Sequence, residues 1–255
     1  MTLRCTSFLL LTLLFCGQAL AAGNGSTTNN DWKLVSDRDG IQVYMRPSND
    51  NSRLKTFRGV TVVETADQYT VAAILNDYAN YPKWLHFVDS ATEISRKSEV
   101  LRYLRFTTLL PWPLSDRDAV LEARVVQTHP APLSEVDIYL DGRPTLIPPQ
   151  SGYVRFPEMR GIFRVRTLNQ PDMQEITYQL TLDPGGHIPI WLANILLRDA
   201  PYFTLLRLRQ MMKDPKYHDK YYDYLDLLGP GRPANAHPHV TQPVKTQDAT
   251  QAHTP

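Results

Sequence analysis

Apolar and polar residues alternate along much of the chain between residues 31 and 228, and this pattern predicts antiparallel strands with one dry face. Leu104 and Phe106, for example, alternate with Tyr103, Arg105 and Thr107. We expect the apolar rows to face the concave side of a curved sheet. The rows predicted to face inward are Leu104 and Phe106; Leu121, Ala123 and Val125; and Tyr178, Leu180 and Leu182.

The order of the predicted elements is a few strands, one helix, a long run of strands and a long C-terminal helix, which is an α+β arrangement. Asp39-Gly40 predicts the turn of an early hairpin, and Thr65 is the expected N-cap of the first helix. The predicted strands are Trp32–Asp37, Ile41–Arg46, Leu54–Glu64, Val88–Ser95, Val100–Thr108, Asp118–Thr128, Glu135–Tyr139, Gly152–Phe156, Gly161–Leu168 and Glu175–Leu182. The predicted helices are Ala66–Asn76 and Ile190–Lys213, with a further short helix over Tyr217–Leu228 as an option.

The run Asp183–Asn194 changes abruptly from strand to helix at Pro-Gly-Gly. The helix that follows has so little polar surface that it must be covered on most faces or bind something apolar. One stripe contains Leu192, Ile195, Leu196, Phe203 and Leu206. Pro201 removes a backbone hydrogen bond inside this helix and is expected to kink or split it, as a hinge or as a static bend.

The N-terminus reads as a secretory signal peptide over residues 1–21, with an apolar run at Phe8–Leu20 and a small-x-small site at Ala19–Ala21. A retained membrane anchor is the alternative. Both cysteines, Cys5 and Cys16, lie in this segment, so the mature protein is expected to be exported without disulfides, to the periplasm or outside the cell.

The composition of the chain after residue 21 divides it into three parts. Residues 22–30 form a polar, flexible linker, residues 31–228 form one folded domain, and residues 229–255 form a disordered tail rich in Pro, His and Thr. The predicted signal peptide carries Arg4 and no acidic residue. Without it the 27 basic and 26 acidic residues become equal in number, which argues against a nucleic-acid partner.

Three segments, spread in order over the domain, resemble START domains, the lipid-transfer domains related to steroidogenic acute regulatory protein. Tyr78–Trp84 (Tyr-Ala-Asn-Tyr-Pro-Lys-Trp) resembles the family's helix-to-strand turn, and Pro111–Asp118 (Pro-Trp-Pro-Leu-Ser-Asp-Arg-Asp) the segment before a central strand. Asp183–Asn194, followed by Arg198-Asp199-Ala200-Pro201, resembles the start of the lid helix in bacterial members.

The resemblance implies a helix-grip fold, in which a curved antiparallel sheet wraps an internal hydrophobic tunnel and the long C-terminal helix closes it. It also implies lipid binding or transfer without a cofactor or a metal. Many sterol-binding members place a buried carboxylate and a buried arginine on neighbouring central strands. Those positions align with Leu104 and Ala123, both apolar, unless a one-residue slip brings in Arg105 or Arg124.

The sequence allows two interpretations for each of several side chains outside the inner rows. Tyr78, Tyr81, Trp84 and Phe87 either line the tunnel mouth or belong to the core. Trp112 either packs on the core or touches a membrane surface transiently. Arg164 and Arg166 lie on a solvated face or meet a lipid phosphate. The predicted ligand-binding set is the inner rows with Trp84, Phe87, Leu192, Ile195, Leu196 and Phe203, and the predicted lid hinge is Gly185, Gly186 and Pro201.

Signals of catalysis are thin, because the sequence has no Gly-x-Ser-x-Gly, no His-Glu-x-x-His and no glycine-rich phosphate loop. The histidines are scattered without metal-ligand spacing. The function that we expect is a monomeric, non-enzymatic carrier that binds or sequesters a lipid or another apolar molecule. The alternatives are a helix-grip cyclase or hydrolase of an apolar substrate, and a ligand-sensing module.

Overall fold

The structure is a computed structural model that describes residues 32–46, 55–170, 172–183, 185, 186, 188 and 190–228, with the backbone alone for 190–197. The predicted signal peptide, the linker and the C-terminal tail lie outside the described residues. So do the side chains of Leu192, Ile195 and Leu196.

The described strands form one sheet of ten strands in the order β1-β2-β3-β10-β9-β7-β6-β5-β4, and β8 pairs with β6 off this path. All neighbours are antiparallel except β6 and β8. The strands are β1 Lys33–Arg38, β2 Ile41–Arg46, β3 Lys55–Glu64, β4 Val88–Ser98, β5 Leu101–Thr108, β6 Asp116–His129, β7 Glu135–Gly142, β8 Tyr153–Arg155, β9 Glu158–Thr167 and β10 Met173–Asp183. Pairing of β3 with β10 joins the two ends of the chain in one curved surface.

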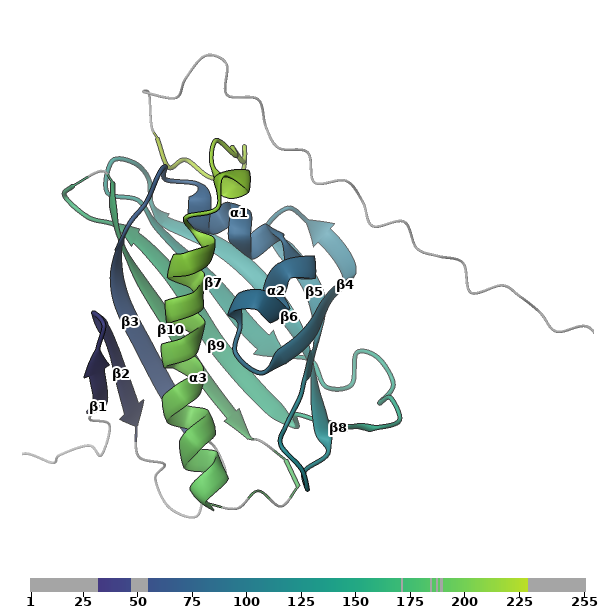
Figure 1. The fold of residues 1–255 in the computed structure, drawn as a ribbon. Helices are drawn as coiled ribbons and strands as arrows, with labels where there is room; N and C mark the ends of the chain where they lie inside the picture. Colours follow the sequence, from purple (N-terminus) through teal and green to yellow (C-terminus); the bar gives the residue numbers. More distant parts are fainter. Residues whose placement is uncertain are drawn as a thin grey trace, which may run out of the picture.

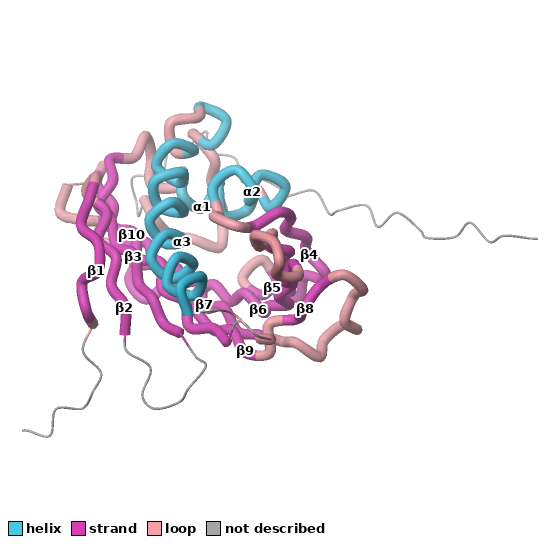
Figure 2. Tube along the Cα trace, turned by 60° about the horizontal axis from the view of Figure 1, so that its bottom comes forward, coloured by secondary structure: helices cyan, strands magenta, loops and turns pink. Residues whose placement is uncertain are grey.

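The helices lie on the concave side of this sheet, and the long α3 runs across it (Figures 1 and 2). The helical elements are α1 Thr70–Asn76, the 3₁₀ turn η1 Tyr78–Asn80, α2 Tyr81–Trp84, α3 Ile190–Met211 and the 3₁₀ turn η2 Pro215–Tyr217. A curved antiparallel sheet that grips a C-terminal helix is the predicted α+β fold, and this prediction is confirmed.

The C-terminal half of α3 is held tightly against β2 and β3. Gly59 makes this approach possible, because a Cβ there would lie 2.8 Å from Leu205 Cδ1 and 3.1 Å from Pro201 Cβ. Leu205 is fully buried, and Arg209 donates to the carbonyl oxygen of Asp39 at 2.5 Å. The helix is continuous through Pro201, so the predicted option of a split is wrong. Close packing of Pro201 and Leu205 on Gly59 of β3 supports the helix at the position where Pro201 lacks a backbone donor.

Two details of the predicted helices are wrong. Thr65 is not the N-cap of α1, since the helix starts at Thr70 and the Asp67 carboxylate accepts from the Tyr69 amide at 2.7 Å. This Asx-type turn competes with helix over residues 66–69. The optional helix over Tyr217–Leu228 is also absent from the described chain, which has only the turn η2 and irregular backbone there.

Candidate functional site

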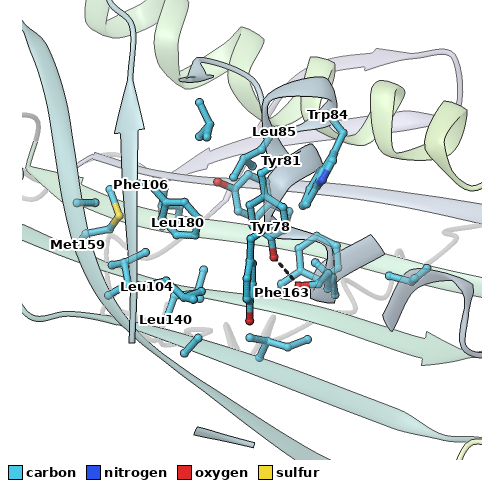
Figure 3. Close-up of a pocket in the computed structure, with 18 of the residues that line it drawn as sticks. Tyr78, Tyr81, Trp84, Leu85, Leu104, Phe106, Leu140, Met159, Phe163 and Leu180 are labelled. Carbon is cyan, nitrogen blue, oxygen red and sulfur yellow. Dashed lines mark hydrogen bonds between the residues drawn. The ribbon is translucent and has the colours of Figure 1, made fainter. Parts of the chain in front are cut away.

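A cavity of about 240 Å³ lies between the concave face of the sheet and the helices. Strands β5, β6 and β7 each contribute every second side chain over the stretch that lines the wall, as the pleat of a strand requires. The lining residues of β9 and β10 also all have one parity within each strand. Figure 3 shows labelled side chains of β5, β7, β9 and β10 together with those of η1 and α2 around the cavity. Most of the wall is aliphatic or aromatic.

Ten of the predicted ligand-binding residues line this cavity. They are Trp84, Phe87, Leu104, Phe106, Leu121, Ala123, Val125, Tyr178, Leu180 and Leu182. Phe203 is not among the lining residues, because it packs on the rings of His86 and Tyr202, each with centroids 5.0 Å away. Contact with a ligand stays a prediction for all of them.

The aromatic residues after α1 form part of the wall. The Tyr81 ring stacks on Phe106 at 5.7 Å between centroids and meets Trp84 edge-on at 5.0 Å. Trp84 in turn contacts Phe163 of β9 at 6.4 Å. Tyr81 and Trp84 are buried, so this cluster joins α2 to the sheet and lines the cavity at the same time.

The pairing of β5 with β6 settles which residues face inward. Leu104 pairs with Leu121, and Arg102 pairs with Ala123. All four line the cavity. Arg105 points to the other face and pairs with Asp118 at 3.0 Å, while Arg124 is exposed over the Tyr139 ring. Neither arginine of the one-residue slip therefore lies among the lining residues.

Arg102 is an inward-facing charged residue that was not predicted from the sequence. It is 5% exposed, and its Nη1 donates to Asn76 Oδ1 at 2.5 Å and to the Tyr78 hydroxyl at 2.9 Å. Its Nη2 forms an ion pair with Glu99 at 3.0 Å. Arg102 has the same parity as Leu104 and Phe106, and this parity is the signal that could have identified it. Burial raises the pKa of Tyr78, so that its hydroxyl stays protonated beside the guanidinium.

A second polar group lies at the same end of the cavity, under α1. The Gln174 amide nitrogen donates to Gln68 Oε1 at 3.0 Å, and Thr167 Oγ1 donates to the same oxygen at 2.9 Å. Ser134 shares a hydrogen bond with Thr167 at 2.8 Å. We call this region, with Arg102, the α1 end.

The opposite end of the cavity lies beside the two glycines that precede α3. Gly185 and Gly186 have φ values of +64° and +58°, which favour glycine. A Cβ on Gly186 would lie 3.5 Å from Nη2 of Arg117. Lys55 lines this end too, since it pairs with Leu182 shortly before the glycines. We call this region the glycine end.

The loop between β5 and β6 lies near the glycine end, where its Leu110 lines the cavity. Trp112 of this loop is 92% exposed and Leu109 is 52% exposed. The predicted packing of Trp112 on the core is therefore wrong, because flanking prolines hold it in a short projecting turn. Two large apolar side chains of this loop are therefore exposed to solvent.

Arg164 and Arg166 are on the outer face of β9 and are not among the lining residues. Arg164 forms two hydrogen bonds to the Asp137 carboxylate, at 2.6 and 2.7 Å. Arg166 forms an ion pair with Glu175 at 2.8 Å. Cross-strand pairing on a solvated face accounts for both residues.

Burial of His86 against Phe87 and Phe203, followed by the charge of Arg207, lowers the pKa of its imidazole to about 4. The unfolded chain takes up this proton near pH 6.5. The free energy of unfolding should therefore fall as the pH drops from about 6.5 to about 4. In urea titrations across this pH range, the free energy of unfolding should fall less for His86→Gln than for the wild type. The matched control is His129→Gln at an exposed site, and equal falls for the His86→Gln variant and the wild type would contradict the assignment.

Within the described residues, no group of three His, Cys, Asp or Glu side chains could hold a metal ion. No helix of the described part is long and apolar enough to cross a membrane.

No family model matches the chain. An uncharacterized protein of Pseudomonas aeruginosa is 35% identical over 186 residues, which cover 72% of this chain and 88% of that protein. Phosphatidylcholine transfer protein of Rattus norvegicus is 27% identical over 205 residues, which cover 76% of this chain and 88% of that protein.

Solved structures of lipid-transfer proteins are similar to this chain as well. The crystal structure of a STAR-related lipid transfer protein fragment from Xanthomonas axonopodis is 28% identical, with a TM-score of 0.62, and the match covers 72% of this chain and 99% of that one. Human StAR-related lipid transfer protein 5, 19% identical with a TM-score of 0.59 over 74% of this chain and 88% of its own, shares the fold. The chain belongs to the START family of lipid-transfer domains.

Proposed function

We propose that this protein binds a lipid in the cavity and carries or sequesters it, without changing it chemically. The observation that carries the proposal is the apolar cavity between sheet and helices. Relatives that are themselves lipid transfer proteins support lipid binding or transfer in general.

The energetics favour a guest held by its hydrocarbon. Each buried methylene contributes roughly 0.8 kcal/mol, so an acyl chain of about 14 methylenes offers on the order of 10 kcal/mol before ordering costs. The cavity volume of about 240 Å³ lies just below the range of roughly 300–1,000 Å³ typical of small-molecule pockets. This size suits one chain better than two.

We further propose that α3 acts as a lid that opens from its N-terminal end. Arg209 and Tyr202 fix the C-terminal half to the β1–β2 hairpin through hydrogen bonds to Asp39. Thr204 fixes it to the segment after α2, where it accepts from the His86 amide at 3.1 Å. The positive φ values of Gly185 and Gly186 support a hinge before the N-terminal half.

The same proposal gives the exposed loop a role at the membrane, where indole side chains are favoured. Trp112→Ala should slow the movement of a fluorescent lipid from donor to acceptor vesicles by about tenfold, since removing one interfacial aromatic weakens docking by roughly 1–2 kcal/mol. Binding of the same lipid in solution should not change. An unchanged transfer rate would contradict the membrane role.

Vesicle transfer also tests the function itself. The wild-type protein should accelerate transfer in proportion to its concentration, and it should retain labelled lipid after separation from the vesicles. A protein that neither accelerates transfer nor retains lipid would contradict the proposal.

A further inference from the structure

The last described residues of the chain, 221–228, form part of the cavity wall although they lie outside the helices and strands. Tyr224, Leu225 and Leu227 line the cavity. Leu225 and Leu227 are 6% and 7% exposed, and both belong to the hydrophobic core. Figure 1 shows this segment, in yellow-green, beside α1. We call residues 221–228 the C-terminal clasp.

The clasp is tied to the α1 end through its backbone. The Tyr69 hydroxyl, just before α1, donates to the carbonyl oxygen of Leu225 at 2.9 Å and accepts from the Leu227 amide at 3.4 Å. The side-chain amide of Gln127 in β6 accepts from the Asp226 amide at 2.8 Å and donates to the Asp226 carbonyl oxygen at 2.6 Å. Because these bonds use backbone atoms of the clasp, they do not depend on the side chains of Leu225 and Leu227.

The clasp also contacts the polar network of the α1 end. The Asn76 side-chain nitrogen donates to the Tyr224 hydroxyl at 3.0 Å, while its oxygen accepts from Arg102 Nη1 at 2.5 Å. Arg102 Nη2 forms an ion pair with Glu99 at 3.0 Å. Both terminal nitrogens of Arg102 are therefore bonded to protein groups. Leu227, by contrast, contributes apolar surface to the same end of the wall.

The proposed lid opens at the glycine end, which is the opposite end of the cavity from the clasp. A guest that enters there keeps its polar head hydrated longest if its hydrocarbon goes in first. Ala119, Leu121, Ala123 and Val125 line the cavity in one row along β6. This row covers six residue steps, or roughly 20 Å, which accommodates a long hydrocarbon chain.

We propose that the C-terminal clasp is the stop that sets the longest hydrocarbon the cavity accepts, with the terminal methyl group of the guest against Leu225 and Leu227. This inference rests on the proposed lipid-binding function and on the lid that is part of it. It adds to that function a limit on the length of the guest.

Displacement of Nile red from the full-length protein by saturated fatty acids, from laurate through palmitate and stearate to arachidate, measures this limit. Competition for the wild-type site should improve about fourfold for each added methylene until the tail reaches the clasp, and should then decline. Leu227→Ala removes an isopropyl group from the stop, so the best chain should become longer by about two methylenes. Leu227→Phe should move the optimum to shorter chains.

Each fatty acid is compared between variant and wild type, so that its own solubility cancels. A chain that is about two methylenes too long for the wild type should bind Leu227→Ala about 15-fold better. Laurate, which ends short of the clasp, should compete equally for every variant, and this shows that each variant folds.

Leu228→Ala is the matched control. It removes the same group from the same segment, at a residue that packs on the core but is not among the described lining residues, and it should keep the wild-type optimum. An optimum that stays in place in Leu227→Ala, or that moves equally in Leu228→Ala, would overturn the inference. Failure of every fatty acid to displace the dye would instead overturn the proposed lipid-binding function.

Discussion

Asp118→Asn is expected to lower the free energy of unfolding by about 3–5 kcal/mol, the usual cost of breaking a buried ion pair by removing one partner. The Asp118 carboxylate is 1% exposed and accepts from Arg155 at 2.7 and 2.8 Å and from Arg105 at 3.0 Å. Arg155 also donates to the carbonyl oxygen of Pro144 at 2.6 Å. The substitution leaves two arginines without their carboxylate and loosens the loop between β7 and β8. Chemical denaturation at neutral pH measures the effect.

The pH dependence gives an independent check. Burial opposes ionisation of Asp118, but the hydrogen bonds and charges of Arg155 and Arg105 outweigh it and lower the pKa of the carboxyl group. Because the folded pKa is below the unfolded value of about 3.9, the stabilisation is present above that pH and is lost as the pH falls toward the folded pKa. The difference between wild type and variant should therefore shrink in acid.

Glu158→Gln is the matched control, because Glu158 belongs to an exposed pair with Arg160. Such pairs contribute about 0–1 kcal/mol. A loss for Asp118→Asn no larger than that of the control would show that the buried pair is not a main support of β6.

Ala123→Trp is expected to abolish lipid uptake while the protein stays folded. Ala123 lies on the cavity wall beside Arg102, its register partner on the neighbouring strand, so an indole there would fill much of the 240 Å³ space. Filling existing space avoids most of the roughly 1–3 kcal/mol that overpacking a solid core costs. Uptake of a fluorescent fatty acid should fall at least about tenfold, with a melting temperature close to the wild type.

The neighbouring position supplies the control for this variant. Arg124→Trp adds the same side chain to the same strand, but on the exposed outer face. It should take up lipid like the wild type. Normal uptake by a folded Ala123→Trp protein would mean that the lipid binds elsewhere.

The inner wall of the cavity was predictable because the strands are half-buried. Burial on one face forces a period of two, and the apolar rows ending at Phe106, Val125 and Leu182 follow that period. The same rule assigns Leu104 and Ala123 to the inside without any knowledge of the guest.

The burial of Arg102 could not be predicted from the alternation of apolar and polar residues. Alternation gives the parity of a position but not the partners that make a buried charge tolerable. Those partners, Asn76, Tyr78 and Glu99, come from α1, η1 and the β4–β5 turn, and only the fold brings them together. Phe203 lies outside the described cavity wall for a related reason. The direction of a residue on an almost wholly apolar helix depends on the neighbours of that helix.

The most direct test of the account is to purify the full-length protein under non-denaturing conditions and weigh it by native mass spectrometry. We predict a population heavier than the chain by the mass of one lipid, which denaturation releases and which is recovered when the emptied protein is offered palmitate. A protein that carries no lipid on purification and gains none when palmitate is added would contradict the claim that the cavity is a lipid site.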